Sequence, residues 1–412
     1  MFIRLAGKSL LNRKGSVVLN LLALTVSIFV LLGVEHIRQQ ARQSFGNTVS
    51  GVDLIVGART GSLNLLLYSV FRVGSPTNNI SWSSYEKIAA GKQVAWAVPI
   101  ALGDSYRGYR VMGTTSDYFT RFSYGNKRPL EFASGKAFAD VLDVVLGAEV
   151  ARKLNHQLGD QLVLSHGIAS TSFSLHDDKP FKVVGILAPT GTPVDRTLHV
   201  SLQGIEAIHI DWQQGVKIPG KAVSIEQLSQ MDLQPKSITA FMLGLNSKIA
   251  TFKVQRQINN YPREPLMAIL PGVALSELWQ MMGTFENALR LISVCILISA
   301  LLGLSAMLLA SIREREHEIQ LLRVIGAPAI FLFLLIELEA LLISITAIVV
   351  AVSLLYAALV VAGDLLASEF GLHISTHIGS ENNLTIALLV ILATLIAAAI
   401  PSLKAYNNAQ LK

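Results

Sequence analysis

The chain is poor in charge and nearly devoid of cysteine. Charged residues make up 15% of its 412 positions and the mean hydropathy is +0.49, whereas a soluble globular domain carries about 25% charged residues. Cys295 is the one cysteine, which excludes an intramolecular disulfide and a metal site built from cysteines. The net charge of +6 comes without a dense basic run, so nucleic acid is not an expected partner. These deficits indicate an integral membrane protein, or a soluble domain joined to membrane segments.

Four long apolar runs in the sequence could form the membrane segments that the composition indicates. The first run has no charge over 18 residues, so a helix there would span roughly 27 Å of a hydrocarbon core about 30 Å thick. It is longer than the apolar part of a signal peptide and no small-residue cleavage motif follows it, which favours an uncleaved anchor. The four runs are Val17–Val34, Leu291–Ile312, Pro328–Gly363 and Leu384–Ile400.

Lysine and arginine mark one side of the membrane. The N-terminal flank, the segment between the second and third runs and the C-terminal tail all carry them, while the loop 364–383 carries none. Positive loops face the cytoplasm. Both termini are therefore expected in the cytoplasm.

The long polar segment after the first run has mixed charge, Gly/Pro punctuation and short β-rich stretches such as Phe181–Leu187 and Thr197–Ser201. The predicted fold is four transmembrane α-helices plus a large α+β extracytoplasmic domain between spans 1 and 2. The expected layout is a cytoplasmic amphipathic helix (1–16), span 1 (17–36), the extracytoplasmic domain with helical stalks (37–287), span 2 (288–311), a cytoplasmic coupling helix (312–327), span 3 (328–363), a short extracytoplasmic loop (364–383), span 4 (384–401) and a cytoplasmic tail (402–412).

The segment 311–327 reads SIREREHEIQLLRVIGA and separates two apolar runs. Helical spacing places its apolar residues on one side and Arg315 and Arg323 elsewhere, and Arg315 can pair with Glu318 three residues on. Gly326 suits a helix C-terminus, and the proline after Ala327 cannot continue the helix. A solvated hairpin and a helix seated in a groove of a cytoplasmic partner both agree with this pattern.

The same segment resembles the cytoplasmic segment of the FtsX/MacB-type permease family, which includes MacB, FtsX and the lipoprotein-releasing LolC and LolE. The resemblance rests on the pattern R-x-x-E-I-x-x-L-R-x-I-G-A at 315–327. Gly147–Ala151, Leu158–Asp160 and Phe181–Leu187 follow in the order of that family's periplasmic core, and Pro401–Ala405 resembles its closing segment. The resemblance covers essentially the whole chain.

The resemblance implies a permease subunit of a type VII ABC transporter that works by mechanotransmission. ATP and Mg²⁺ would bind to a separate cytoplasmic ATPase dimer, so this chain would be neither an enzyme nor a cofactor protein. A second permease copy or a paralogue, a periplasmic partner or adaptor and the lipid bilayer are the other implied partners. The residues implied to contact the ATPase are Arg315, Glu318, Ile319, Leu322, Arg323 and Gly326. Glu337 and Glu339 resemble the family's acidic residue at the start of span 3 and are candidate interfacial carboxylates.

Several alternatives remain open from the residues alone. The segment 215–222 approximates a phosphate-binding loop but lacks its Ser/Thr and has an interior proline, so no nucleotide site is expected. His373 and His377 have i,i+4 spacing beside carboxylates, but no third histidine follows; no metal site is predicted, and a metal-handling system stays an alternative. The others are an FtsX-like regulator of a periplasmic enzyme and a receptor or scaffold without an ATPase. The apolar stretch Leu63–Val73 suits either a buried helix or a lining that contacts a lipidic substrate.

Overall fold

The chain forms two compact units in a computed structural model that describes residues 2–46, 48, 50–166, 178–210, 212–213, 216–217, 225–228, 231–314, 328–370 and 381–410. The helical unit comprises Met1–Ala41, Met282–Ala367 and His373–Lys412. The sheet domain comprises Arg42–Met281 and Ser368–Leu372. The domain that separates spans 1 and 2 in the sequence is thus a separate folded unit, as predicted.

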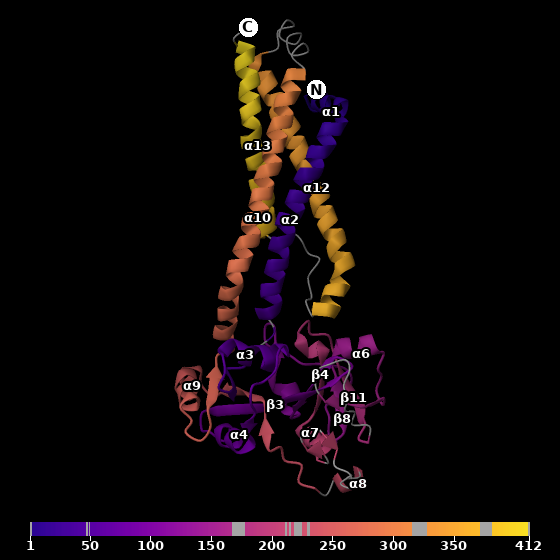
Figure 1. Cartoon of the computed structure of the whole chain (residues 1–412), viewed down its shortest axis with the longest axis vertical. Coiled ribbons are helices and arrows are strands. Elements are labelled where there is room, and N and C mark those ends of the chain that lie inside the picture. Colours follow the sequence, from indigo (N-terminus) through magenta and orange to yellow (C-terminus); the bar gives the residue numbers. More distant parts are fainter. Residues whose placement is uncertain are drawn as a thin grey trace. The chain divides into compact units, whose positions relative to one another are not determined.

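Within the described residues, the helical unit contains four helices long and apolar enough to cross a membrane; Figure 1 shows their course. Its helices are α1 (Phe2–Asn12), α2 (Lys14–Gly46), α10 (Pro271–Glu314), α12 (Ala329–Phe370) and α13 (Glu381–Gln410). The candidate spans within them are Lys14–Gln40, Pro271–Glu314, Ala329–Val361 and Asn382–Asn407. This confirms the four predicted spans. Helix α13 continues through Pro401, so the fourth helix extends beyond the apolar run that indicates it.

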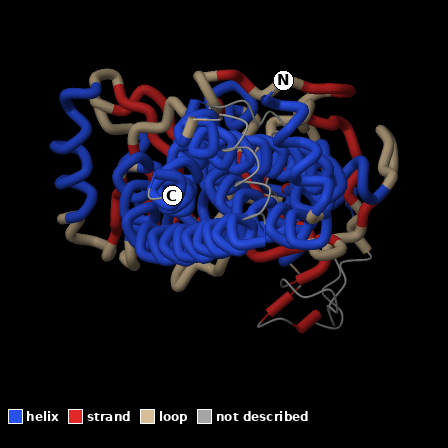
Figure 2. The backbone as a smooth tube through the Cα atoms, turned by 90° about the horizontal axis from the view of Figure 1, so that it is seen from above, coloured by secondary structure: helices blue, strands red, loops and turns tan. Residues whose placement is uncertain are grey.

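Leucine and alanine fill the core of the helical unit. Viewed end-on, its helices lie side by side (Figure 2), and one apolar cluster joins α2, α10, α12 and α13. Ala340, Ala347 and Ala398 are fully buried there, because small side chains let membrane helices approach closely. The Ser305 hydroxyl donates a hydrogen bond to the Ala397 carbonyl at 2.8 Å, which links α10 to α13.

The sheet domain is built around a mixed sheet of eleven strands. Nine strands form its main path in the order β17-β1-β16-β3-β4-β12-β8-β11-β7, while β10 pairs with β3 and β9 with β11. Those strands are β1 (Leu54–Ala58), β3 (Val94–Tyr106), β4 (Tyr109–Thr114), β7 (Phe132–Gly135), β8 (Asp143–Leu146), β9 (Gln161–Leu162), β10 (Ser165–His166), β11 (Phe181–Leu187), β12 (Thr197–Ser201), β16 (Ala240–Leu245) and β17 (Leu266–Ile269).

Short elements surround this sheet. The two-residue strands are β2 (Ile80–Ser81), β5 (Ser123–Tyr124), β6 (Arg128–Pro129), β13 (Trp212–Gln213), β14 (Val216–Lys217) and β15 (Ser237–Ile238). The helices are α3 (Ser62–Leu66), the π-helix η1 (Leu67–Phe71), α4 (Trp82–Ala89), α5 (Asp117–Arg121), α6 (Ala148–Leu154), the 3-10 helix η2 (Pro193–Arg196), α7 (Leu202–His209), α8 (Ile225–Leu228), the 3-10 helix η3 (Lys248–Ala250) and α9 (Thr251–Asn259).

Strand β3 joins the two halves of the sheet. Its first part pairs antiparallel with β16 from Val94 to Ile100, and its second part pairs antiparallel with β4 from Ala101 to Tyr106. Beyond β4 the sheet becomes mixed, since β12 runs parallel to β4 and β11 runs parallel to β8. Parallel pairs need long crossover connections: α6 lies in the connection from β8 to β11, and α5 lies in that from β4 to β12. The mixed sheet agrees with the predicted α+β class.

The apolar stretch Leu63–Val73 contributes to the core of the sheet domain. Leu65, Leu66 and Tyr68 are at most 1% exposed, and they pack in one cluster with strands β1, β3 and β4. The buried-helix interpretation is therefore the one that the structure supports. The sequence did not indicate its second half, which forms the π-helix η1.

A buried polar group follows η1. Arg72 takes a left-handed backbone conformation with φ at 60°, and its Nη2 donates to the Met112 sulfur at 2.7 Å. The ring of Tyr118 stacks on His199, with ring centroids 5.3 Å apart. Burial and the nearby Arg72 charge lower the pKa of His199 to about 3. The sheet domain thus holds one histidine neutral beside a buried cation.

Gly147 begins the α6 motif because no side chain fits at that position. A Cβ on Gly147 would lie 2.3 Å from the Val194 carbonyl oxygen and 2.4 Å from that of Asp195. Both neighbours are backbone atoms of η2 and cannot rotate away. We expect Gly147→Ala to lower the free energy of unfolding of the sheet domain by about 3 kcal/mol.

Tryptophan fluorescence during denaturant unfolding measures this change, because all four tryptophans, Trp82, Trp96, Trp212 and Trp279, lie in the sheet domain. Gly103→Ala is the matched control, since a Cβ there meets no atom within 4 Å and should change stability by less than about 0.5 kcal/mol. Equal stability of the two variants would contradict the assignment of Gly147 to close backbone packing.

Candidate functional site

Two acidic and two basic side chains meet between α2 and α10, where the first apolar run ends. Helix α2 leaves that run at Val34 and presents Glu35 and Arg38 one turn apart. Helix α10 presents Glu286 and Arg290 at i,i+4 spacing, also one turn apart. We call these four residues the ionic cluster; all four belong to the helical unit.

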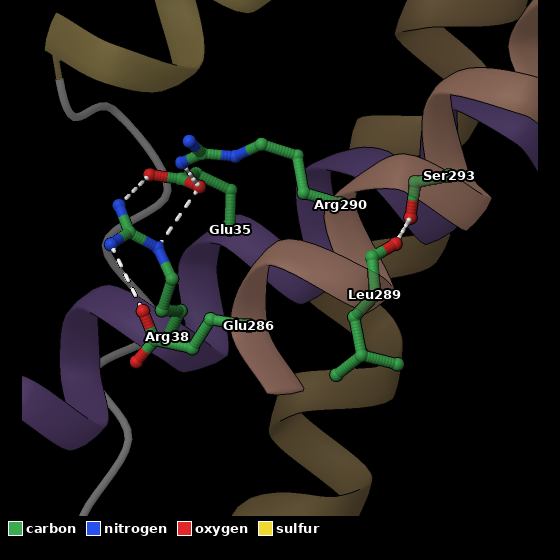
Figure 3. Close-up of polar contacts among 6 residues, drawn as sticks. All are labelled: Glu35, Arg38, Glu286, Leu289, Arg290 and Ser293. Atoms are coloured by element: carbon green, nitrogen blue, oxygen red, sulfur yellow. Dashed lines mark hydrogen bonds and ion pairs between the residues drawn. The ribbon is translucent and has the colours of Figure 1, made fainter. Parts of the chain in front are cut away.

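Glu35 lies at the centre of the ionic cluster (Figure 3). Its carboxylate accepts a hydrogen bond from Arg290 Nη2 at 3.0 Å and another from Arg38 Nε at 3.1 Å. Arg38 Nη1 in turn reaches Glu286 Oε2 at 3.5 Å. Each charged group thus faces an opposite charge, and two of these contacts cross from one helix to the other. The cluster is electrically neutral and holds α2 against α10.

The contribution of the ionic cluster to stability depends on how far its side chains are buried. The Glu35 side chain is 9% exposed and that of Arg38 20%, whereas Arg290 is 53% exposed. Exposed ion pairs contribute about 0–1 kcal/mol, but removal of one partner of a buried pair costs about 3–5 kcal/mol, since an unpaired charge remains. The contact through Glu35 lies between these limits. Its loss exposes two guanidinium groups to one another with only Glu286 to balance them.

An open groove of about 680 Å³ begins at the ionic cluster and continues between α2, α10 and α13. Its charged end is formed by the four cluster residues, and the rest of its wall is predominantly aliphatic. Each of the three helices contributes aliphatic side chains to that wall, for example Leu31 from α2, Leu297 from α10 and Leu389 from α13. The arrangement combines an apolar trough with a charged end, which suits an amphipathic neighbour.

The residues predicted to contact the ATPase follow α10 in the sequence. Arg315, Glu318, Ile319, Leu322, Arg323 and Gly326 lie outside the described residues. Glu339 is described and is buried at 3% exposure on α12, while Glu337 is half-buried on the same helix. Their role at an interface stays a prediction.

The ionic cluster was missed by sequence reasoning. Glu35 and Arg38 read as the polar continuation of span 1, and Glu286 and Arg290 read as the polar approach to span 2. One sequence pattern could have revealed the four residues: each of the two helices carries one acidic and one basic residue, one turn apart, next to its apolar run. Oppositely charged residues at the same depth of two adjacent helices pair in order to avoid an unpaired charge near the hydrocarbon.

No group of three histidine, cysteine or acidic residues that could hold a metal ion occurs within the part of the chain that the structure describes. His373 and His377 lie outside that part, as does His176. Asp178 is described and contacts the Lys179 ammonium at 3.4 Å. The prediction that the histidine-rich segments bind no metal ion is therefore untested.

The four candidate spans and the mixed sheet domain between the first two define a multi-pass membrane protein, and two family models give its class as an ABC-transporter permease. A family model described as "MacB-like periplasmic core domain" matches residues 17–261. A second, described as "FtsX-like permease C-terminal", matches residues 290–409. The chain belongs to the MacB/FtsX-type permease family, as its sequence motifs suggested.

Two solved structures are similar to the chain. The periplasmic region of MacB from Actinobacillus actinomycetemcomitans matches 56% of this chain and 94% of its own length, with 11% identity and a TM-score of 0.34. The extracellular domain of the noncanonic ABC-type transporter YknZ from Gram-positive bacteria matches 52% of this chain and 98% of its own length, with 13% identity and a TM-score of 0.30. A search of curated proteins finds no match. The family assignment rests on the two family models.

Proposed function

We propose that this chain is the permease subunit of an ABC complex in which a separate cytoplasmic ATPase dimer binds ATP and Mg²⁺. The chain converts ATP hydrolysis into movement of the sheet domain outside the membrane, for export or extraction of a substrate. It has no catalytic residues of its own in this role. Membership of the MacB/FtsX-type family supports the proposal, because permeases of ABC systems act with ATPase partners.

The observation that carries the mechanism is the continuity of two helices. α2 runs unbroken from Lys14 to Gly46 and α10 from Pro271 to Glu314, so each contains residues of the helical unit and of the sheet domain. An unbroken helix transmits displacement along its axis without a hinge. The ionic cluster joins the two helices, so that a movement imposed on one is shared by the other.

The proposed topology places the termini and residues 315–327 in the cytoplasm of a bacterium, and the sheet domain on the outer side of the inner membrane. The distribution of lysine and arginine supports this orientation. The ATPase would bind through Arg315, Glu318, Ile319, Leu322, Arg323 and Gly326. A second permease copy or a paralogue would complete the membrane part of the complex.

The test is a double replacement in the coupling segment, Glu318→Ala with Arg323→Ala. We expect the purified complex to lose about tenfold of its permease-stimulated ATPase activity, equivalent to about 1.4 kcal/mol of coupling. The measurement is ATP hydrolysis by the complex recovered from native membranes, compared with the ATPase alone. Insertion and folding of the sheet domain, followed by tryptophan fluorescence, should be unchanged.

Arg313→Ala with Glu314→Ala is the matched control, because it removes the same two residue types just before the motif. Both side chains are exposed there. If the control impairs ATPase stimulation as much as the test variant, the motif is not the coupling contact. If no ATPase accompanies the wild-type chain in detergent extracts, the chain acts as a receptor or scaffold. The partner that co-purifies outside the membrane distinguishes a transporter from a regulator of a periplasmic enzyme.

A further inference from the structure

One face of the sheet domain carries cations and exposed apolar side chains. It is formed by η3, α9 and the end of α4. Ile249 is 93% exposed and Phe252 is 70% exposed. The sequence contains no aspartate or glutamate from Ser247 to Arg263. The exposed cations of this face are Lys87, Lys92, Lys248, Lys253, Arg256 and Arg263, and we call it the cationic face.

The helical period explains why the face is presented outward. Thr251, Val254 and Ile258 are buried and attach α9 to the domain. Phe252, Lys253 and Arg256 fall on the opposite side of the helix. A small helix has little reason to expose a phenylalanine beside two cations unless that side is covered in a complex, because aromatic residues and arginine are enriched at interfaces.

Among the residues that the structure describes, the cations of this face have no counterion: none of the six forms an ion pair with another residue. The carboxylates nearest in the sequence accept hydrogen bonds from uncharged donors, and neither forms an ion pair with a cation of this face among the described residues. Glu86 accepts a hydrogen bond from Trp82 at 2.8 Å, and Glu264 accepts one from the backbone amide of Ser81 at 2.9 Å. The positive charge of the face is therefore available to an external anion.

A groove of about 380 Å³ runs between α4 and α9, beside the exposed side of α9 and along the side that carries Val254 and Ile258. Val94, Val254 and Ile258 supply its apolar lining, and Lys87 and Lys92 supply its charge. Gln93 also lines it, and the Gln93 side-chain oxygen is buried without a hydrogen-bond partner among the described residues. A buried acceptor that is left unpaired costs about 1–3 kcal/mol, so a donor from a bound chain would relieve a penalty that the free protein carries.

We propose that the cationic face and its groove are the docking site for an acidic polypeptide segment of a partner protein. In the groove, carboxylates of the partner face Lys87 and Lys92, and a backbone N–H reaches Gln93. Where the partner continues over the exposed side of α9, its carboxylates face Lys253 and Arg256, and an apolar side chain packs against Phe252. The inference deepens the proposed function, since it identifies where an outer partner of the permease binds and what charge that partner carries.

A polypeptide fits this surface better than a lipid surface does. An interfacial membrane helix lays a broad apolar face into the headgroup region, whereas α9 has nine residues and one exposed aromatic side chain. A flat bilayer also leaves a concave groove and its buried acceptor unfilled. An extended chain enters a groove and brings one donor per residue.

The experiment measures binding of labelled peptides to the full-length chain in detergent by fluorescence anisotropy. The probe is a peptide of glutamate and leucine, and its comparison peptide has glutamine at every glutamate. We expect the glutamate peptide to bind about tenfold more tightly at low salt and to lose this advantage as salt is raised. Lys253→Glu with Arg256→Glu should weaken its binding about tenfold, and Phe252→Ala should weaken binding of both peptides.

Arg152→Glu with Lys153→Glu is the matched control, because it reverses the same two residue types at exposed positions on α6 of the same domain. Equal binding of the two peptides, or equal weakening by the test and control variants, would overturn the proposal. Tighter retention on anionic lipid vesicles than on the glutamate peptide would also overturn it, in favour of a membrane surface. No ATPase is present in this measurement, so its outcome is separable from that of the proposed function.

Discussion

Replacement of Glu35 by glutamine should reduce ATPase stimulation by the permease about tenfold, the largest functional effect expected of a single residue described here. Glutamine keeps the size of the side chain and removes its charge. Arg290 then loses the negative charge 3.0 Å away, and Glu286, 3.5 Å from Arg38, is the one carboxylate left in the cluster. Two guanidinium groups would lie close together at the point where, in the proposed mechanism, α2 and α10 move together.

The structural readout is the distance between the two helices. Spin labels at Ile37 and Asn287, introduced after Cys295→Ser has removed the native thiol, report the separation of α2 and α10 beside the ionic cluster. We expect the distance distribution to broaden in Glu35→Gln. Glu314→Gln is the control, because Glu314 is 68% exposed and contacts Arg13 at 3.7 Å, where a pair contributes about 0–1 kcal/mol.

A charge exchange separates pairing from side-chain loss. Glu35→Arg and Arg290→Glu each create a like-charge contact when made alone, but together they restore one ion pair between the helices. The double variant should therefore stimulate ATP hydrolysis more than either single variant, with a coupling energy of about 1–2 kcal/mol. If the losses of ATPase stimulation in the two single variants simply add in the double variant, the two residues act independently. The ionic cluster would then have no part in the proposed mechanism.

His199→Phe should make the sheet domain markedly more resistant to acid. The pKa of His199 falls from an ordinary 6.5 to about 3 because of burial and the nearby Arg72. Above pH 6.5 the ring is neutral in both folded and unfolded chains, so it imposes no penalty. As pH falls from 6.5 towards 3, only the unfolded chain takes up the proton. The wild-type domain should therefore lose up to about 5 kcal/mol over that window.

Tryptophan fluorescence in denaturant again supplies the measurement, now taken at several pH values. His209 provides a control of opposite sign: burial opposes its charge, but the hydrogen bond and charge of Asp104 raise the pKa of His209 overall. Its stabilising contribution is present below pH 6.5 and is lost as pH rises through the raised pKa. His209→Gln should thus increase acid sensitivity. An acid response of His199→Phe identical to wild type would contradict the assignment.

Local patterns in the sequence were sufficient for much of the fold. Phe181–Leu187 and Thr197–Ser201 form strands β11 and β12 with the predicted bounds, because alternating or continuous apolar residues have one favourable extended arrangement. The bounds of strand β1, Leu54–Ala58, depend instead on its neighbours in the sheet. Pairing with β16 and β17 sets those limits, and the partners lie far along the chain.

By itself the sequence determined the four spans, the class of the inserted domain and the family, because apolar run length, charge distribution and short motifs are local properties. Only the tertiary structure decided which charges meet. Arg290 and Glu35 are 255 positions apart, and Arg72 approaches His199 only after the sheet has formed around them. It also decided which apolar and basic residues stay uncovered, such as Phe252 and Arg256 on α9. Pairing, desolvation and exposure depend on neighbours that folding brings together, and no local pattern encodes those neighbours.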